Sequence, residues 1–243
     1  MAVRPTVTEV TDRQVHYLIN PAAARLGVCS VCWTFCTGHE RCYRCEHDPR
    51  WTTAVAPISL SVHGGQLHDV LRGYKTLGGQ QGKLLQRDVI AMLWRFLRDH
   101  ESCLAERCDV DTFPLVTTVP SGSKRRDVDH PLRTIVGEYV RPTASRYERL
   151  LTRSTAEVSE RTVDPAKYDA NRSINGQAVL LIDDTWTTGA NVQSAAGALA
   201  GAGAGAIGVV VLGRHVRPDF ADHADQLRRL PRRFSWSRCV HHC

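Results

Sequence analysis

Residues 179–191 constrain the fold of this chain more than any other segment. Val179–Ile182 is a short, branched apolar run, which is typical of a strand buried in a parallel sheet. Two adjacent carboxylates, Asp183 and Asp184, follow directly, and a turn containing Gly189 comes next. Open α/β sheets bind ligands at the carboxyl ends of their strands. The segment therefore predicts an α/β fold with a mostly parallel sheet flanked by helices, and a ligand site where this strand ends.

The residue types of this segment suit a ribose 5-phosphate. Neighbouring carboxylates can accept hydrogen bonds from the vicinal hydroxyls of a ribose. Thr187, Thr188 and Asn191 offer side-chain donors, and Gly189 lets successive N–H groups point at one anion. A helix expected over about 191–199 adds the positive end of its dipole. The alternative is a chance strand, turn and helix whose Asp and Thr residues only cap the helix.

The order of apolar strand, acidic pair, Thr-Thr-Gly and helix resembles the signature of type I phosphoribosyltransferases, which bind 5-phosphoribosyl 1-pyrophosphate (PRPP). The resemblance implies that Asp183 and Asp184 contact the ribose diol, directly or through Mg²⁺ and water. It also implies PRPP contacts along the rest of the motif, with the 5-phosphate in the turn: Thr185, Thr187, Thr188, Gly189, Ala190 and Asn191.

A second loop is a candidate for the pyrophosphate of the same ligand. The strand expected over Phe113–Val119 is followed by small residues and then cations, in residues 120–126. Backbone N–H groups of Ser121 and Gly122, with Lys124 beside them, could hold a pyrophosphate there. The same residues could also form a solvated basic loop. Lys75 is a further pyrophosphate candidate, and an exposed, solvated lysine is its alternative.

Composition indicates an ordinary globular protein. The 243 residues suffice for one mid-sized domain or a domain with a small appendage. A net charge of +6 suits an anionic ligand but is too small to imply nucleic acid. The uncharged stretch Ala195–Gly213 is rich in glycine and alanine, so a helix, a turn and the strand Ile207–Leu212 explain it better than a membrane span. No export signal is evident, and we expect a cytoplasmic protein without a membrane partner.

Five of the nine cysteines lie between residues 29 and 45. Cys29 and Cys32 form one C-x-x-C pair, and Cys42 and Cys45 form another, so two tight turns could offer four thiolates to a structural Zn²⁺. A knuckle over about 27–48 has too little apolar sequence for a core of its own, so the metal would hold it together. A disulfide or redox role is the alternative. Spare ligand candidates are Cys36, His39 and His47.

Other cysteines and histidines crowd the carboxyl end: Cys239, His241, His242 and Cys243. They could form a second metal site, complete the first one, or belong to a mobile tail. Cys103 and Cys108 flank an expected helix end, and we interpret them as buried or idle thiols.

The remaining pattern predicts the rest of an α/β domain over 51–243, after a segment 1–50 that carries the knuckle. Residues 154–176 are polar and unpatterned, which favours a lid over bound PRPP or, alternatively, surface disorder. The other expected elements are a strand at Val55–Val62, an amphipathic segment at Leu67–Leu77, a helix at Gln86–Arg98, a helix opening at His130-Pro131 and a strand at Arg149–Arg153.

Cysteine pairs ahead of such a domain make the chain similar to the ComF-like competence family. The weaker matching segments are Gly73-Tyr74-Lys75, Val119-Pro120-Ser121 and Asn171-Arg172. Two departures stand out: Asn191 occupies a position where Thr is common, and Asp129-His130-Pro131-Leu132 replaces a usual Arg-Gly-Phe-Asn. The second departure puts the family's contacts to the second substrate in doubt.

The resemblance implies a phosphoribosyltransferase that binds PRPP with Mg²⁺. It would transfer ribose 5-phosphate to an unidentified nucleophile and release pyrophosphate. We expect the nucleophile to be a nitrogen atom. The alternative is a non-catalytic protein of the same fold that acts in DNA uptake. Such a module would meet single-stranded DNA or a protein partner through its basic runs, Lys124–Arg126 and Arg228–Arg233. By resemblance a homodimer is expected.

Overall fold

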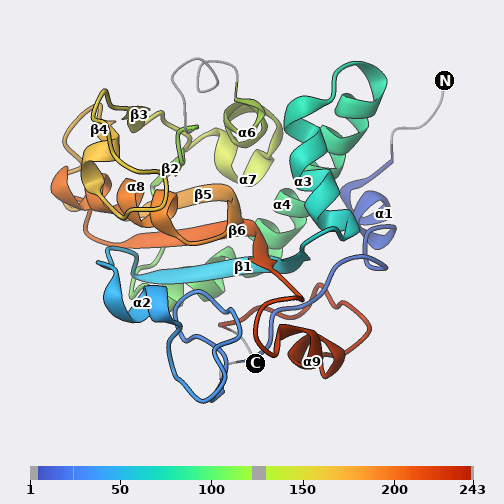
Figure 1. Ribbon diagram of the computed structural model, residues 1–243. Helices are drawn as coiled ribbons and strands as arrows, with labels where there is room; N and C mark the ends of the chain where they lie inside the picture. The colour runs from blue at the N-terminus through green and yellow to red at the C-terminus, as the bar shows by residue number, and fades with distance from the viewer. Residues whose placement is uncertain (1–4, 24, 122–129, 242–243) are drawn as a thin grey trace.

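A four-stranded, fully parallel sheet forms the centre of the molecule (Figure 1). The computed structural model describes residues 5–23, 25–121 and 130–241. The strands lie in the order β1-β6-β5-β2. Their bounds are β1 (Ala54–Val62), β2 (Leu115–Thr118), β5 (Val179–Trp186) and β6 (Ile207–Val216). The predicted α/β class with a parallel sheet is confirmed.

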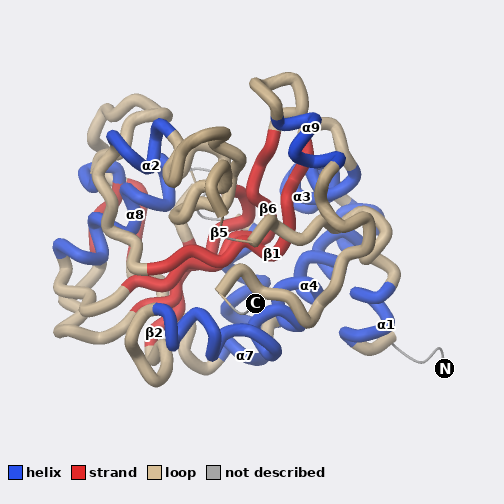
Figure 2. Tube along the Cα trace, turned by 90° about the horizontal axis from the view of Figure 1, so that it is seen from below, coloured by secondary structure: helices blue, strands red, loops and turns tan. Residues whose placement is uncertain are grey.

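Helices cover both faces of this sheet because its strands are apolar on both sides. Along β5, Leu180 and Ile182 pack into one core and Val179 and Leu181 into the other, as the alternation of a strand requires. The first face carries α3 (Gln66–Thr76), α4 (Gly79–Arg107), α6 (Pro131–Thr134) and the π-helical turn Ile135–Tyr139. The second carries α8 (Ala190–Gly201) and the cysteine-rich segment with α2 (Tyr43–His47). Figure 2 shows α8 and α2 on one side of the strands, and α4 and α7 (Arg141–Ala144) on the other.

Helix α4 is longer at both ends than the predicted Gln86–Arg98. Its apolar face continues to Leu104 and Ala105, both buried. At the other end, α4 begins at Gly79 with Gly78 as its N-cap, directly after Leu77 caps the end of α3. A Cβ at Gly82 would lie 2.0 Å from the carbonyl oxygen of Leu77, so only glycine allows this close turn between the helices.

The polar segment 154–176 is structured in its second half. A 3₁₀ turn (Pro165–Lys167) leads into β4 (Tyr168–Ala170), which pairs antiparallel with β3 (Leu151–Arg153). The N–H of Asp164 donates to Ser194 Oγ of α8 at 2.9 Å. This half of the segment thus packs on α8, close to the start of that helix, and its role as a lid stays a prediction.

The amino and carboxyl ends of the chain add two short helices, α1 (Val7–Asp12) and α9 (His223–Arg228). The stretch Ala195–Gly213 divides into α8, a glycine turn and β6, as predicted. Within the described part of the chain, no helix is both long and apolar enough to cross a bilayer.

Candidate functional site

The acidic pair lies inside β5, because this strand continues beyond the apolar run as far as Trp186. Asp184 is 4 % exposed, and the hydroxyl of Tyr74 donates to its Oδ2 at 2.6 Å. Lys75 forms an ion pair with the same oxygen. Tyr74 and Lys75 both come from the last turn of α3. The structure therefore places Lys75 at the acidic pair and adds Tyr74, which the sequence analysis had named only as part of a family segment.

The two carboxylates differ in their electrostatics. Asp183 is half-buried, and its Oδ1 accepts the N–H of Asp184 at 2.9 Å. Burial, followed by the charge of Asp184, raises the pKa of Asp183 to about 8. Burial next to Asp184 also raises the pKa of Tyr74 well above its usual range, so its hydroxyl stays a donor. Asp184 thus has compensating partners, whereas Asp183 keeps a proton near neutral pH that a bound cation would displace.

The raised pKa of Asp183 predicts that folding stability falls as pH rises from about 4 to about 8. In this window the unfolded chain releases the proton that the folded protein retains, so deprotonation favours unfolding. Urea unfolding at pH 5 and pH 8 should show this loss, and Asp183→Asn should reduce it. Asp169→Asn, at an exposed position of β4, serves as the control and should keep the wild-type slope. An unchanged slope in Asp183→Asn would contradict the assignment.

The turn after β5 is shaped to receive an anion. Gly189 has φ +87° and precedes α8, a twelve-residue helix that begins at Ala190. Thr187 is exposed, and Thr188 Oγ1 accepts the N–H of Ala190 at 3.3 Å. Asn191 is exposed in the first turn of the helix. The predicted phosphate residues therefore gather at a helix N-terminus, where N–H groups and the dipole favour negative charge.

Gly189→Ala should strain this turn. A Cβ there would lie 2.5 Å from the ring of Trp186, and the positive φ disfavours any side chain. We expect a loss of about 1–3 kcal/mol in the free energy of unfolding, measured by chemical denaturation. Gly201→Ala in the same helix has open space around it and should leave stability unchanged or slightly higher. Equal stability of both variants would contradict the strain argument.

Arg214, on β6, joins the turn to the cysteine-rich segment. It is 6 % exposed and donates to the carbonyl oxygens of Trp186 at 2.9 Å and Thr187 at 3.1 Å. It also donates to Cys32, at 2.9 Å to the carbonyl oxygen and 3.5 Å to Sγ. The sequence analysis missed this residue. The predicted strand ended at Leu212, and only the observed extension of β6 to Val216 makes Arg214 a buried arginine, a residue type that is rarely buried without partners.

The two C-x-x-C pairs meet as predicted. The Sγ atoms of Cys29, Cys32, Cys42 and Cys45 all lie within 4.8 Å of one another, at metal-binding distance. Cys36 lies outside this group, and its thiol donates to the carbonyl oxygen of His39 at 3.2 Å. Hydrogen bonds from the neighbouring thiols, that of Cys32 foremost, hold the pKa of Cys29 well below the usual range. The hydrogen bonds to Cys29 in turn raise the pKa of Cys42 and of Cys45, so these two thiols keep their protons until a metal ion replaces them.

Lys167 is a second functional candidate that sequence analysis missed. The residue is fully buried, and its Nζ donates to the carbonyl oxygen of Glu160 at 2.8 Å and to Asn191 Oδ1 at 3.5 Å. Burial, and then the charge of Arg153, lower its pKa. A cation therefore lies beside the last residue of the phosphate turn. Nothing in the local sequence distinguishes this lysine from a surface one.

The candidate pyrophosphate loop leaves the sheet next to the acidic pair. β2 pairs with β5, and the N–H of Val119 donates to the carbonyl oxygen of Ile182 at 3.0 Å. Ser121 is half-buried just beyond this point. Gly122 and Lys124 lie outside the described residues. Their predicted role stays a prediction.

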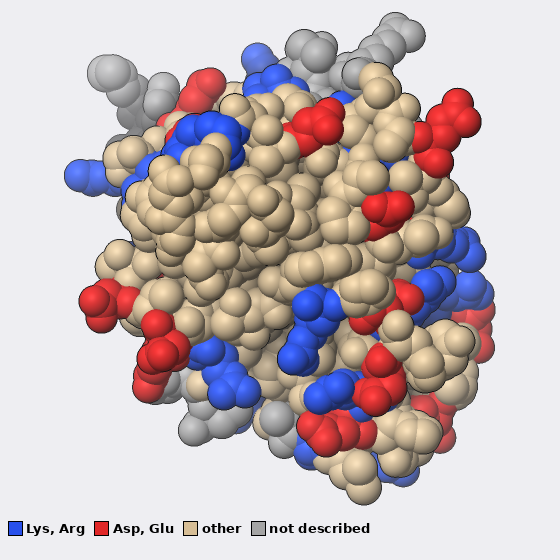
Figure 3. Space-filling model, turned by 90° about the vertical axis from the view of Figure 1, so that its left-hand side faces the viewer, with Lys and Arg blue, Asp and Glu red and all other residues tan. Residues whose placement is uncertain are grey.

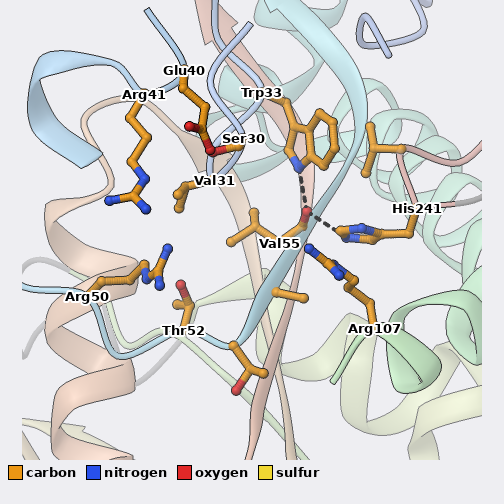
Figure 4. Close-up of a pocket in the computed structure, with 13 residues that line it drawn as sticks. Ser30, Val31, Trp33, Glu40, Arg41, Arg50, Thr52, Val55, Arg107 and His241 are labelled. Carbon is orange, nitrogen blue, oxygen red and sulfur yellow. Dashed lines mark hydrogen bonds between the residues drawn. The ribbon is translucent and has the colours of Figure 1, made fainter. Parts of the chain in front are cut away.

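A separate cavity of about 490 Å³ lies beside the amino end of β1 (Figure 4). Arg41 and Arg50 extend into it from one side, and Arg107 lies on the other (Figure 4). Trp33 Nε1 and His241 Nε2 both lie within hydrogen-bond distance of the Val55 carbonyl oxygen, at 2.7 and 3.0 Å. The three arginines favour anionic molecules in this cavity. Neither the acidic pair nor the phosphate turn contributes to its lining.

Comparison of the sequence with protein-family models and with curated proteins found no match to either. The chemistry of the acidic pair, the turn and the cysteine group is therefore the basis for any functional assignment.

Proposed function

We propose that the chain is a PRPP-binding enzyme of the type I phosphoribosyltransferase class. The observation that carries the proposal is the juxtaposition of Asp183 and Asp184 in β5 with the Gly189 turn at the start of α8. One strand and the turn that follows it thus offer acceptors for a diol and donors for a phosphate. The resemblance of these residues to the PRPP motif supports the same ligand.

The described residues would act mainly by positioning and charge stabilisation. The acidic pair would accept the ribose hydroxyls, and the turn from Thr187 to Asn191 would hold the 5-phosphate. A nitrogen nucleophile would then attack the anomeric carbon. The bond from this carbon to pyrophosphate would break, pyrophosphate would leave with the electron pair, and the nucleophile would lose a proton to solvent. Ser121, with the loop after it, would contact the leaving group.

Mg²⁺ fits the same place, because carboxylate oxygens and phosphates are its preferred ligands. Asp183 is the better ligand of the two acids, since Asp184 already pairs with Lys75 and Tyr74. When bound, the ion would neutralise charge on the departing pyrophosphate.

We also propose that the four-cysteine group holds a structural Zn²⁺. Zinc–sulfur bonds of about 2.3 Å in a tetrahedron place the sulfurs about 3.8 Å apart. Cys32 Sγ and Cys42 Sγ are separated by 3.7 Å. Arg214 donates to Cys32 Sγ and would offset part of the negative charge of four thiolates, as outer partners of metal ligands do.

Two measurements test the enzyme proposal. Calorimetry with PRPP and Mg²⁺ should show saturable binding, and ribose 5-phosphate should compete because it shares the diol and the phosphate. Pyrophosphate release should then appear with at least one amine or nucleobase in a screen of acceptors. Absence of PRPP binding would refute the ligand assignment.

PRPP binding without turnover across the screen would favour the non-catalytic module. Surface charge bears on that alternative at one face and in one of the two basic runs. On the face carrying α8 and the β3–β4 hairpin, the described basic and acidic side chains are interspersed over uncharged surface (Figure 3). In the basic run at 228–233, Arg228 pairs with Asp225. DNA binding that weakens steeply with salt would instead support the module.

A further inference from the structure

Three metal-ligating side chains come together outside the acidic pair and the four-cysteine group. His100 and Cys103 lie one turn apart on α4, and Cys239 belongs to the segment that follows α9. One ligand atom from each of the three lies within 4.8 Å of the other two. Cys103 Sγ is 3.9 Å from Nδ1 of His100. Because His100 and Cys103 are three residues apart, they lie on the same face of the helix. The fold places Cys239 beside them.

The imidazole of His100 is held in the form that can bind a metal. Its Nε2 lies 2.6 Å from the carbonyl oxygen of Trp236. A carbonyl oxygen only accepts, so Nε2 carries the proton and donates it. In the neutral ring the lone pair is then on Nδ1, the nitrogen that lies 3.9 Å from Cys103 Sγ. A backbone carbonyl that fixes the ring in this way is the usual outer partner of a metal-bound histidine.

Burial and charge favour a divalent ion at this place. His100 is 6 % exposed and Cys239 is 5 % exposed. Two thiolates, one neutral imidazole and a divalent cation sum to zero charge, so a metal removes the cost of burying thiolates. Thiolate and imidazole donors select zinc over magnesium or calcium.

We propose that His100, Cys103 and Cys239 form a second zinc site, which fastens the carboxyl-terminal segment to α4. The site offers three protein ligands and leaves one tetrahedral position for water or a further ligand. The fastened segment includes Val240 and His241, which line the arginine-bearing cavity at the amino end of β1. The metal therefore also holds one wall of that cavity in place.

Zinc content tests the site directly. Protein expressed in zinc-supplemented medium and purified under reducing conditions should hold one zinc ion more per chain than Cys103→Ser or Cys239→Ser. Cys108→Ala is the matched control, because Cys108 is a buried cysteine next to α4 that lies outside the group. This variant should keep the wild-type zinc content. Because the readout is the difference from wild type, it does not depend on the four-cysteine group. Equal zinc content in wild type and Cys103→Ser would overturn the proposal.

Thiol labelling of the wild-type chain gives a second test that needs no variant to fold. In the zinc-loaded protein, Cys103 and Cys239 should resist alkylation by iodoacetamide, and both should react once a chelator has removed the metal. Peptide mass spectrometry reads out each cysteine separately. Labelling that is indifferent to the chelator, or a Cys103–Cys239 disulfide in protein purified without reductant, would overturn the proposal.

Discussion

Replacement of both Asp183 and Asp184 by Asn should abolish PRPP binding. Asn keeps the shape of the side chain but cannot ionise, so neither position can offer a carboxylate to the ribose hydroxyls or to Mg²⁺. A hydrogen bond to a charged group contributes about 1.5–3 kcal/mol, so loss of two such bonds should weaken binding by roughly a hundredfold or more. Titration calorimetry with PRPP and Mg²⁺ measures this directly.

The control for this experiment is Asp169→Asn, which removes an exposed carboxylate from β4 and should leave PRPP affinity unchanged. The single variants should also differ. Asp184→Asn removes the partner of Lys75 and Tyr74 and should perturb the local structure, whereas Asp183→Asn should affect mainly the ligand. Wild-type affinity in the double variant would exclude the acidic pair as the diol site.

Removal of metal from the four-cysteine group should unfold the knuckle over 27–48 and weaken PRPP binding at a distance. Structural zinc in small modules contributes about 10 kcal/mol or more to folding. Arg214 carries the effect, because it binds Cys32 and the carbonyl oxygens of Trp186 and Thr187. Amide hydrogen exchange should therefore rise in the knuckle and in residues 187–190 when a chelator is added.

The matched variants for this second experiment are Cys42→Ser and Cys36→Ser. The first removes a member of the group, and the second removes a neighbouring cysteine outside it. We expect fast exchange in the knuckle of Cys42→Ser and the wild-type pattern in Cys36→Ser. Fast exchange confined to the knuckle, with residues 187–190 unchanged, would show that Arg214 does not couple the knuckle to the turn after β5.

Local patterns predicted the parts of the site that are continuous in sequence. The strand, turn and helix from Val179 to Leu199 are one such part, since apolar periodicity and a glycine decide them within a few residues. The two C-x-x-C pairs are another, because tight turns fix the direction of each pair. In both cases nearly all the determinants lie close together along the chain.

Contacts between distant segments could not be predicted in the same way. Tyr74 reaches Asp184 because the end of α3 packs beside β5, and Arg214 reaches Cys32 across 182 positions. Cys239 joins His100 only because the carboxyl-terminal segment returns to α4. Such partners depend on tertiary packing, which leaves little trace in local periodicity. The extension of α4 is similar, because Gly82 lies against the backbone of Leu77, a close approach that helix propensity does not record.

The alternation of side chains along β5 has a consequence for how this site can change. Asp184 faces α3, and its contacts are Tyr74 and Lys75, whereas Asp183 points toward the opposite layer. Substitutions in α3 therefore change the direct contacts of Asp184, and they act on Asp183 through charge, since Asp184 and Lys75 both shift its pKa. Two adjacent residues of one strand thus lie on opposite faces of the sheet, and a molecule bound to both must reach across the end of the strand.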